Sequence, residues 1–508
     1  MTLSLITPTP ALASELTWSV VSTPLDGTGF LLVPGSDIKA LAAGSGGTVF
    51  AAASGPQPGL YRLSDGSSWA LAAPSNEPIV AVAADGINIC YATAFQVFRS
   101  SDGGHTFSAF GGPDNAGSGH VSISALAISA SVMLAGTRDD DSGQFGGVYL
   151  LDAARPFSGW QDTNLGARDV YAVAFSPGFS DDHQLVAVAG DEVNLYITTN
   201  YGAGWGANVL EARLSGPASC LSASIAFADD YSASLATGAC VQYVAVDSGA
   251  VSGGAYAVRS LPAPAAPLVS RLSLPQGLDV SGLVVSGPSA GARILAGDAD
   301  SAQVYLSRDG GANFGPSLKP PSGGSRTILA GSDGDIYAGT SGDDSAVSVS
   351  PDGGSSWSQV GLIDSTASSL VDMAVSPAYD SDGAIFLITW GDGFGLWRRQ
   401  ASGGWQRLMC SQSVGVEALG HIALAPGYGT GSRTVCVAGT NAGQPSLWTS
   451  TDGGQSFARR DVPLAVDSLA VAADGSALMA CFDGSSGVLL RSNGGGPGLL
   501  NSRIGAEP

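Results

Sequence analysis

Lysine is nearly missing from this chain of 508 residues, which contains only Lys39 and Lys319. The 43 acidic residues outnumber the 21 basic ones and give a formal net charge of −22. Nucleic-acid binding needs a basic surface that neutralises phosphates, and an anionic membrane attracts the same kind of surface. The composition therefore excludes nucleic acid as a partner and leaves cations, neutral polymers and basic protein patches.

Long apolar runs and metal-binding motifs are missing as well. No run approaches the roughly 18 apolar residues of a membrane-spanning helix, so we expect no transmembrane segment. The six cysteines contain no C-x-x-C pair, and the four histidines contain no H-E-x-x-H motif. We therefore expect neither a metal nor a cofactor. Cys220 and Cys240 flank one repeat, where a disulfide is an alternative to two free thiols.

The N-terminus indicates export. Residues 1–13 are rich in Thr and Pro and end in Ala11-Leu12-Ala13, which resembles a signal-peptidase site. We predict that this segment is the remnant of a secretory signal, with a disordered leader as the alternative. Export places the protein outside the cell, at the cell surface or in the periplasm.

Glycine is abundant, with 72 residues, and an octapeptide of the pattern S/T-x-D/N-x-G-x-x-W/F recurs five times. The hydroxyl and the carboxylate are expected to accept hydrogen bonds from amides of their own turn, and the glycine supplies a backbone conformation that other residues adopt at a cost. The aromatic residue is expected to fill the space between packed sheets. The residues assigned to these structural roles are Ser100, Asp102, Gly104, Phe107; Thr198, Asn200, Gly202, Trp205; Ser307, Asp309, Gly311, Phe314; Ser350, Asp352, Gly354, Trp357; and Ser450, Asp452, Gly454, Phe457.

A short apolar strand occurs ten times along the chain. It precedes each of the five octapeptides and also degenerate copies of the octapeptide. A second strand follows it, a third leads into the octapeptide and a fourth begins at its aromatic residue, which is the order of a propeller blade. We predict an all-β propeller over residues 14–500, most simply one ten-bladed ring, followed by a tail at 501–508. The strand-like residues 16–22 are expected to complete the last blade, which lacks a fourth strand near Leu500. Two five-bladed rings are the alternative.

These octapeptides resemble the Asp-box, or bacterial neuraminidase, repeat of sialidases, xyloglucan hydrolases, photosystem assembly factors and sortilin-type receptors. Phrases such as residues 175–188 and 375–388 resemble bacterial relatives of the sortilin-type domain, whose propeller has ten blades. The resemblance implies that the boxes lie on the outer rim, away from the ligand. The cysteine-rich module that follows the sortilin propeller is missing, and so is the F/Y-R-I-P motif of sialidases. Ten repeats also cannot form the two seven-bladed rings of a xyloglucan hydrolase.

Candidate binding residues lie where the second and third strands connect, on the face opposite the boxes. Carboxylates there suit cations or a basic partner, and carboxylates beside aromatic rings suit a polysaccharide; a solvated acidic surface is the alternative. In the first strands of two successive repeats, Asp372 and His421 replace small residues and form either a ligand-binding pair or a hydrogen-bonded core pair. The candidates on the connecting loops are Asp139, Asp191, Asp298, Asp300, Asp343, Asp344 and Asp392, with Trp390 and Phe394 beside the last.

These patterns favour an exported, non-catalytic scaffold that binds protein or polysaccharide on its acidic loop face. We assign no catalytic residue. The alternatives are a glycoside hydrolase that uses carboxylates of that face, because carboxylate separation is not readable from sequence, and an assembly factor for a membrane complex.

Overall fold

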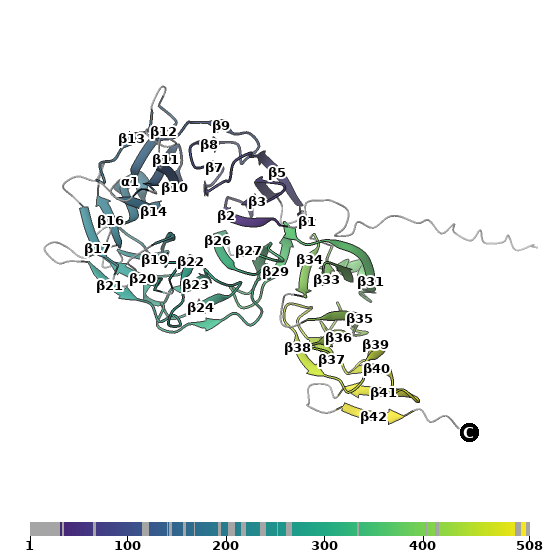
Figure 1. Cartoon of the computed structure of the whole chain (residues 1–508). Coiled ribbons are helices and arrows are strands. Elements are labelled where there is room, and N and C mark those ends of the chain that lie inside the picture. Colours follow the sequence, from purple (N-terminus) through teal and green to yellow (C-terminus); the bar gives the residue numbers. More distant parts are fainter. Residues whose placement is uncertain are drawn as a thin grey trace, which may run out of the picture.

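The computed structural model describes residues 31–503 apart from short stretches, the longest of which are 114–120, 202–208, 234–239, 261–266 and 493–498. For residues 31–32, 68, 195–201, 209–211, 332 and 499–503 it describes the backbone alone. Within these residues the protein is almost entirely β, with eight four-stranded sheets and one eight-stranded sheet. The eight-stranded sheet joins two blades edge to edge, so the chain forms ten blades (Figure 1).

Each blade has four antiparallel strands in chain order. The first strands of blades 1 to 10 are β2 (Asp37–Ala43), β6 (Ala81–Asp85), β10 (Val121–Ser129), β14 (Asp169–Phe175), β18 (Ser222–Phe227), β22 (Val280–Ser286), β26 (Arg326–Ser332), β31 (Ala367–Val375), β35 (Ala418–Leu424) and β39 (Val466–Val471). The second strands are β3 (Val49–Ser54), β7 (Asn88–Ala92), β11 (Val132–Asp139), β15 (Gln184–Gly190), β19 (Val241–Asp247), β23 (Arg293–Asp298), β27 (Asp335–Ser341), β32 (Ile385–Gly391), β36 (Val435–Asn441) and β40 (Ala477–Phe482).

The outer half of each blade holds the third and fourth strands. The third strands are β4 (Gly59–Ser64), β8 (Val97–Ser100), β12 (Gly147–Asp152), β16 (Leu195–Tyr201), β20 (Gly254–Arg259), β24 (Val304–Ser307), β28 (Val347–Ser350), β33 (Phe394–Arg399), β37 (Gln444–Ser450) and β41 (Gly487–Ser492). The fourth strands are β5 (Ser68–Pro74), β9 (Ser108–Ala109), β13 (Gln161–Asp162), β17 (Val209–Arg213), β21 (Leu268–Arg271), β25 (Gly315–Pro316), β29 (Ser358–Gly361), β34 (Gln406–Cys410), β38 (Ala458–Asp461) and β42 (Leu499–Arg503). Three single turns of helix, α1 (Phe179–Asp182), α2 (Tyr379–Asp382) and η1 (Ser289–Gly291), follow first strands, and β1 (Leu31–Leu32) pairs in parallel with β30 (Ile363–Asp364).

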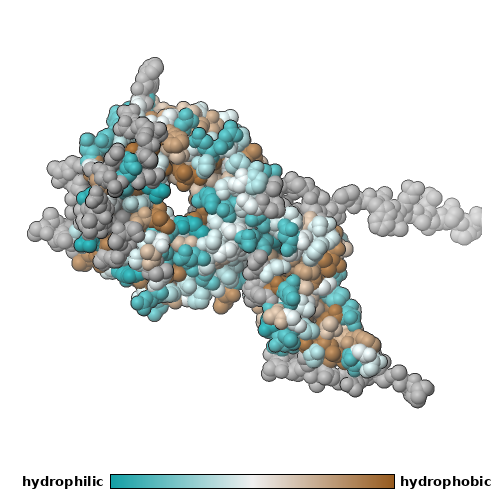
Figure 2. Space-filling model, viewed as in Figure 1, coloured by the Kyte–Doolittle hydropathy of each residue, from teal (hydrophilic) through white to brown (hydrophobic). Residues whose placement is uncertain are grey.

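Blades 1 to 7 form a closed ring, which corrects the prediction of one ten-bladed ring. The first strand of blade 1, β2, packs against β26 and β27 of blade 7. Side chains of both blades share one buried core, in which Ile38 and Trp69 lie with Tyr337 and Leu362. Figure 2 shows the opening through the middle of this ring. Each junction between blades is local, so the number of repeats in the sequence does not determine where the ring closes.

Blades 8 to 10 continue from the ring as an arc of three blades (Figure 1). The fourth strand of blade 7, β29, pairs with the fourth strand of blade 8, β34, through Gln359 and Arg407. The fourth strand of blade 10 is β42, which lies near the C-terminus and pairs with β41. The prediction that an N-terminal strand completes this blade is therefore wrong, because the position in the sheet is already filled; residues 16–22 lie outside the described residues.

The octapeptides form the predicted hydrogen bonds in the four copies whose side chains are described. In the first copy Ser100 Oγ donates to Asp102 Oδ1 at 2.7 Å and accepts from Gly104 N at 2.9 Å. Hydrogen bonds from Thr106 hold the pKa of Asp102 well below its usual range. The copies that begin at residues 307, 350 and 450 have the same serine–aspartate and glycine–serine bonds. Of the copy at 198–205, Gly202 and Trp205 lie outside the described residues.

The octapeptide glycines also dock each blade on the preceding one. Gly354 has a φ of +98°, and a Cβ added to it would lie 2.3 Å from the side chain of Leu295 in blade 6. Gly311 and Gly454 meet Leu272 and Leu408 of their preceding blades in the same way. The glycine thus permits both the turn and the close approach of two blades.

None of the six cysteines forms a disulfide, so the one considered for Cys220 and Cys240 is not formed. Cys220 Sγ instead donates to the carbonyl of Ser222 at 3.3 Å, and burial raises the pKa of this thiol. No helix among the described residues is long and apolar enough to cross a membrane.

Candidate functional site

The octapeptides and the predicted binding loops lie at opposite ends of the strands of each blade. Because the four strands of a blade are antiparallel, the turn between the third and fourth strands lies on the face opposite the connection between the second and third strands. The octapeptides form the turn between the third and fourth strands, and the acidic loops connect the second and third strands. The structure thus separates shape-forming residues from candidate binding residues, as the sequence predicted.

An apolar groove runs across the first strands of the arc and has a volume of about 540 Å³. Trp390, at the end of β32, is 49% exposed, and Phe394 begins β33 on the other side of the same tight turn. Both aromatic residues line the groove, but Asp392 between them does not. The other lining residues are Ser369, Val371, Ala418, Leu419, Gly420, His421, Ala438, Gly439, Thr440, Ala465 and Val466.

Asp372 and His421 face each other beside this groove. Each follows a β-bulge in its first strand, and His421 Nδ1 lies 4.0 Å from Asp372 Oδ2. Both side chains are about one-third exposed (35% and 33%), so they form no buried core pair. Asp372 also accepts hydrogen bonds from the backbone N–H groups of Ile422 and Met373, at 2.9 and 2.8 Å. The carboxylate therefore ties two blades together at the edge of the groove, where His421 lines the wall.

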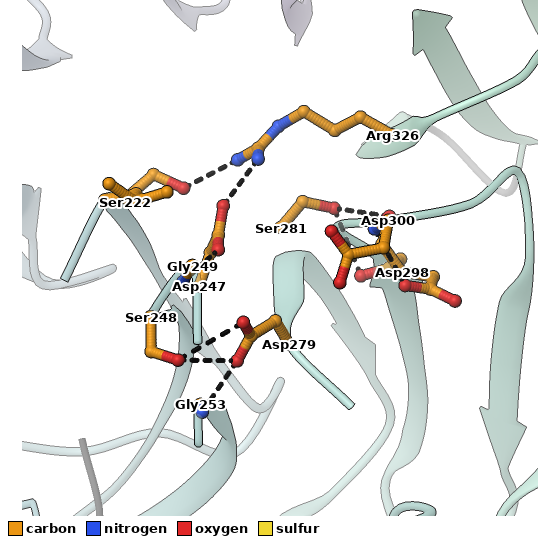
Figure 3. Close-up of polar contacts among 12 residues, drawn as sticks. Ser222, Asp247, Ser248, Gly249, Gly253, Asp279, Ser281, Asp298, Asp300 and Arg326 are labelled. Carbon is orange, nitrogen blue, oxygen red and sulfur yellow. Dashed lines mark hydrogen bonds and ion pairs between the residues drawn. The ribbon is translucent and has the colours of Figure 1, made fainter. Parts of the chain in front are cut away.

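A second cluster lies on the loop face of blades 5 to 7 and contains Asp298 and Asp300 (Figure 3). Asp298 accepts hydrogen bonds from the backbone of Asp300 at 2.9 Å and from Ser301 Oγ at 2.6 Å. Asp300 itself is exposed. Partial desolvation of its carboxyl group, followed by the charges of Asp298, Asp279 and Asp247, nevertheless raises its pKa.

Arg326 is the cation of this cluster. Its guanidinium reaches across blade 6 to Asp247, with Nη1 2.5 Å from Oδ2, and to Ser222 Oγ at 2.6 Å (Figure 3). Asp279 accepts from Ser248 Oγ at 2.9 Å and from Gly253 N at 2.6 Å. Most of these carboxylate oxygens are thus used in bonds within the protein, and the cluster joins three blades.

The remaining predicted residues are dispersed. Asp139 is buried at the end of β11 and accepts from the backbone of Asp141 at 2.8 Å. Asp343 is exposed, whereas Asp344 forms an ion pair with the buried Arg407 at 2.7 Å, where the ring meets the arc. Asp392 accepts from Thr366 N at 3.1 Å. Asp191 lies outside the described residues.

A recurring aspartate that begins or directly precedes the first strand was not identified from the sequence. Asp37, Asp169 and Asp279 each accept a hydrogen bond from a backbone amide in the loop of the preceding blade: Gly342, Gly146 and Gly253 respectively. We call this contact the aspartate clasp. Its signal was available, because in all three places Asp stands directly before a β-branched residue that begins an apolar run. It was overlooked because the aspartate lies just outside the apolar run that marks the strand.

The groove has the lining of a surface that can receive an apolar group. Among the described residues, no group of three or more His, Cys, Asp or Glu side chains is placed to hold a metal ion. The groove offers apolar walls with two aromatic rings and one imidazole, and it is fixed by strands rather than by long loops. Such a surface accepts an apolar group and orients it with few polar contacts.

The sequence matches no protein-family model and no curated protein. Among solved structures, Sqt1 of Saccharomyces cerevisiae is 12% identical, with a TM-score of 0.43 over 86% of this chain and 99% of that one. YCF48 bound to a D1 peptide is also 12% identical, with a TM-score of 0.39 over 60% of this chain and 90% of that one. An extracellular domain from B. thetaiotaomicron is 10% identical, with a TM-score of 0.40 over 94% and 74%. All three TM-scores lie below 0.5, so neither a fold nor a function is inferred from these likenesses.

Proposed function

We propose that the protein is a non-catalytic binding scaffold that holds an apolar segment of a partner protein in the groove of the arc. The observation that carries this proposal is the exposure of Trp390 beside Phe394 on a wall of rigid strands. Exposed aromatic residues of this kind are enriched among the residues that dominate binding energy at protein interfaces. The outer rim octapeptides, which resemble Asp-boxes, hold the shape of the scaffold.

A protein ligand suits the groove better than a polysaccharide. The walls consist mainly of Val, Leu, Ala and Gly, so they present few side-chain donors or acceptors to sugar hydroxyls. An apolar peptide side chain needs little beyond the apolar wall. The signal-like residues 1–13 and the scarcity of lysine support a location outside the cytoplasm.

The direct test is a peptide array probed with the purified chain, followed by titration of each hit. Trp390→Ala is expected to weaken binding of a true ligand at least about tenfold, as loss of a central aromatic contact does. Phe95→Ala is the matched control, because Phe95 is also exposed (45%) but lies on the ring. Peptide hits that bind the two variants equally would contradict the proposal. So would a peptide array that gives no hits when a glycan array does.

Glycoside hydrolysis is the second candidate, and one observation favours it. The raised pKa of Asp300 is the property that a general acid needs, although its carboxylate neighbours are engaged in internal hydrogen bonds. Incubation with polysaccharides tests it. Release of sugar that disappears in both Asp300→Asn and Asp298→Asn would establish catalysis and end the non-catalytic proposal.

A further inference from the structure

All junctions between successive blades within the ring and within the arc follow one rule. The first strand of a blade contacts the first and second strands of the blade before it: β14 contacts β10 and β11, and β39 contacts β35 and β36. At the closure of the ring, β2 contacts β26 and β27 of blade 7 in the same way. Because β2 takes this position, the first strand of blade 8, β31, makes no such contact with a preceding blade among the described strands.

The open side of β31 is apolar. Leu370 and Met373 are 52% and 59% exposed, and Val375 is exposed as well. Met373 and Val375 pair with Leu387 and Ile385, so all these side chains share one face of the sheet. Leu387 and Ile385 are covered by Ala346 and Ile363, which leaves only the first strand open.

Corresponding positions in other blades are buried. Leu370 precedes the bulge of its strand, as Ile38, Val170 and Leu419 do in blades 1, 4 and 9, and those three are at most 1% exposed. Their burial comes from the preceding blade, which supplies the contact that β31 lacks. The exposed face of β31 is therefore built like a blade-to-blade surface and is uncovered.

The opposite end of the arc has the complementary surface. In β40, Met479 and Cys481 face blade 9 and belong to the core between the two blades. Side chains alternate along a strand, so Leu478 and Ala480 face the other way; Leu478 is half-buried and Ala480 is exposed. No first strand of a following blade covers β39 and β40 among the described residues.

We propose that two copies of this chain associate head to tail, with β39 and β40 of each copy packed on β31 of the other, so that the two arcs close one six-bladed ring. Six lies within the range of about 4–8 blades in which propellers close. A two-fold axis makes the two new junctions identical and covers every open end. The partner is argued from the surfaces themselves: each end matches the surface type that the chain already uses between its other blades.

Closure also completes the groove. The residues after the bulges are small in the ring, where Ala125, Ala172 and Gly282 occupy this position, but in the arc they are Asp372, His421 and Ser468. In the six-bladed ring the three polar residues of both copies surround one channel, and the groove becomes part of its wall. This inference does not depend on the nature of the ligand.

The mass of the full-length chain in solution tests association. Size-exclusion chromatography with light scattering at tens of micromolar is expected to give a dimer for the wild-type protein. Met373→Asp and Ala480→Asp place a charge on either side of the junction, and each is expected to give a monomer with unchanged circular dichroism. Leu318→Asp is the control, because Leu318 is 84% exposed on the ring, and it is expected to stay dimeric. A monomeric wild-type protein, or dimers that survive both charged variants, would overturn the proposal.

Cross-linking tests the head-to-tail geometry. Met373 and Ala480 correspond to Ile422 and Ile388, which belong to one core cluster between blades 9 and 8. A mixture of Met373→Cys and Ala480→Cys chains, oxidised with copper phenanthroline, is expected to form a disulfide-linked dimer above the wild-type background. Either variant alone is expected to form none. A cross-link in Met373→Cys alone would show a head-to-head dimer and contradict the six-bladed ring.

Discussion

Asp37 accepts a hydrogen bond from the backbone N–H of Gly342, 305 positions along the chain, at 2.8 Å. Two further bonds cross the same junction, from Ser341 Oγ to the carbonyl of Ile38 and from Ser345 Oγ to the carbonyl of Ser36. Together with the shared core around Ile38, they close the ring between blades 1 and 7. The closure therefore uses the same aspartate clasp that joins blades 3 and 4 and blades 5 and 6.

Asp37→Ala is expected to loosen this closure. Loss of the clasp leaves the N–H of Gly342 without its acceptor, which costs about 1–2 kcal/mol of unfolding free energy. Hydrogen exchange is expected to rise in β2 and β27 and to stay unchanged in blade 4. Lys39→Ala is the control, because it removes only the surface ion pair of Asp37 at 2.7 Å, worth less than about 1 kcal/mol. Equal exchange in the two variants would show that the clasp does not hold the ring closed.

Gly354→Ala is expected to destabilise the ring by about 2–4 kcal/mol, from a strained positive φ and from a clash with Leu295. The added Cβ would lie 2.3 Å from Leu295 Cδ2. Gly46→Ala separates the two causes, since Gly46 also has a positive φ, +64°, but nothing lies within 4 Å of its Cβ. Urea unfolding measures the loss of stability in each of the two variants. The double variant Gly354→Ala/Leu295→Ala tests the clash. If adding Leu295→Ala recovers none of the stability lost in Gly354→Ala, the glycine acts through its backbone conformation alone.

Thr106→Val tests the carboxylate of the first octapeptide. Thr106 donates to Asp102 Oδ2 at 2.7 Å, and this bond is the largest cause that lowers the pKa of Asp102 below its ordinary 3.8. A lowered pKa in the folded state stabilises the protein above pH 3.8, and this stabilisation is lost as the pH falls through the lowered value. The variant is therefore expected to unfold at a higher pH in an acid titration. Thr430→Val, at another exposed turn, is expected to leave the titration unchanged.

Local features of the fold were readable from the sequence because they depend on neighbouring residues. The bonds between Ser100, Asp102 and Gly104 occur within five residues, and the blade order follows from strand period and turn spacing. The seven-bladed closure depends instead on Ile38 and Tyr337, which meet only after five intervening blades have set the curvature. Trp390, Phe394 and His421, which line the groove, and Asp372 beside it were named from the sequence as candidates, but the groove itself was not predicted because it depends on the arc.

Lys319 lies buried where the ring meets the arc. Its Nζ donates to Ser358 Oγ in β29 and to the carbonyl of Leu408 in β34, both at 3.2 Å. Burial, followed by the charge of Arg398, lowers the pKa of Lys319 from 10.5 to about 7. The charges of Asp452, Asp352 and Cys410 have smaller effects on this pKa in the opposite direction. One of only two lysines in the chain thus joins the outer strands of blades 7 and 8, and no carboxylate among the described residues forms an ion pair with it.

This buried lysine is expected to make the protein more stable as the pH rises from 7 to about 10. In that range the unfolded chain binds a proton at Lys319 that the folded protein does not, so the unfolding free energy rises by up to about 1.4 kcal/mol per pH unit. Below pH 7 both states are protonated and the contribution is constant. Lys319→Met keeps the volume of the side chain and removes its charge. The variant is expected to gain most in stability over the wild type at pH 7, and this difference is expected to shrink towards pH 10. Lys39→Met, on the exposed surface, is the matched control. A difference between wild type and Lys319→Met that stays constant from pH 7 to pH 10 would show that Lys319 is charged in the folded protein.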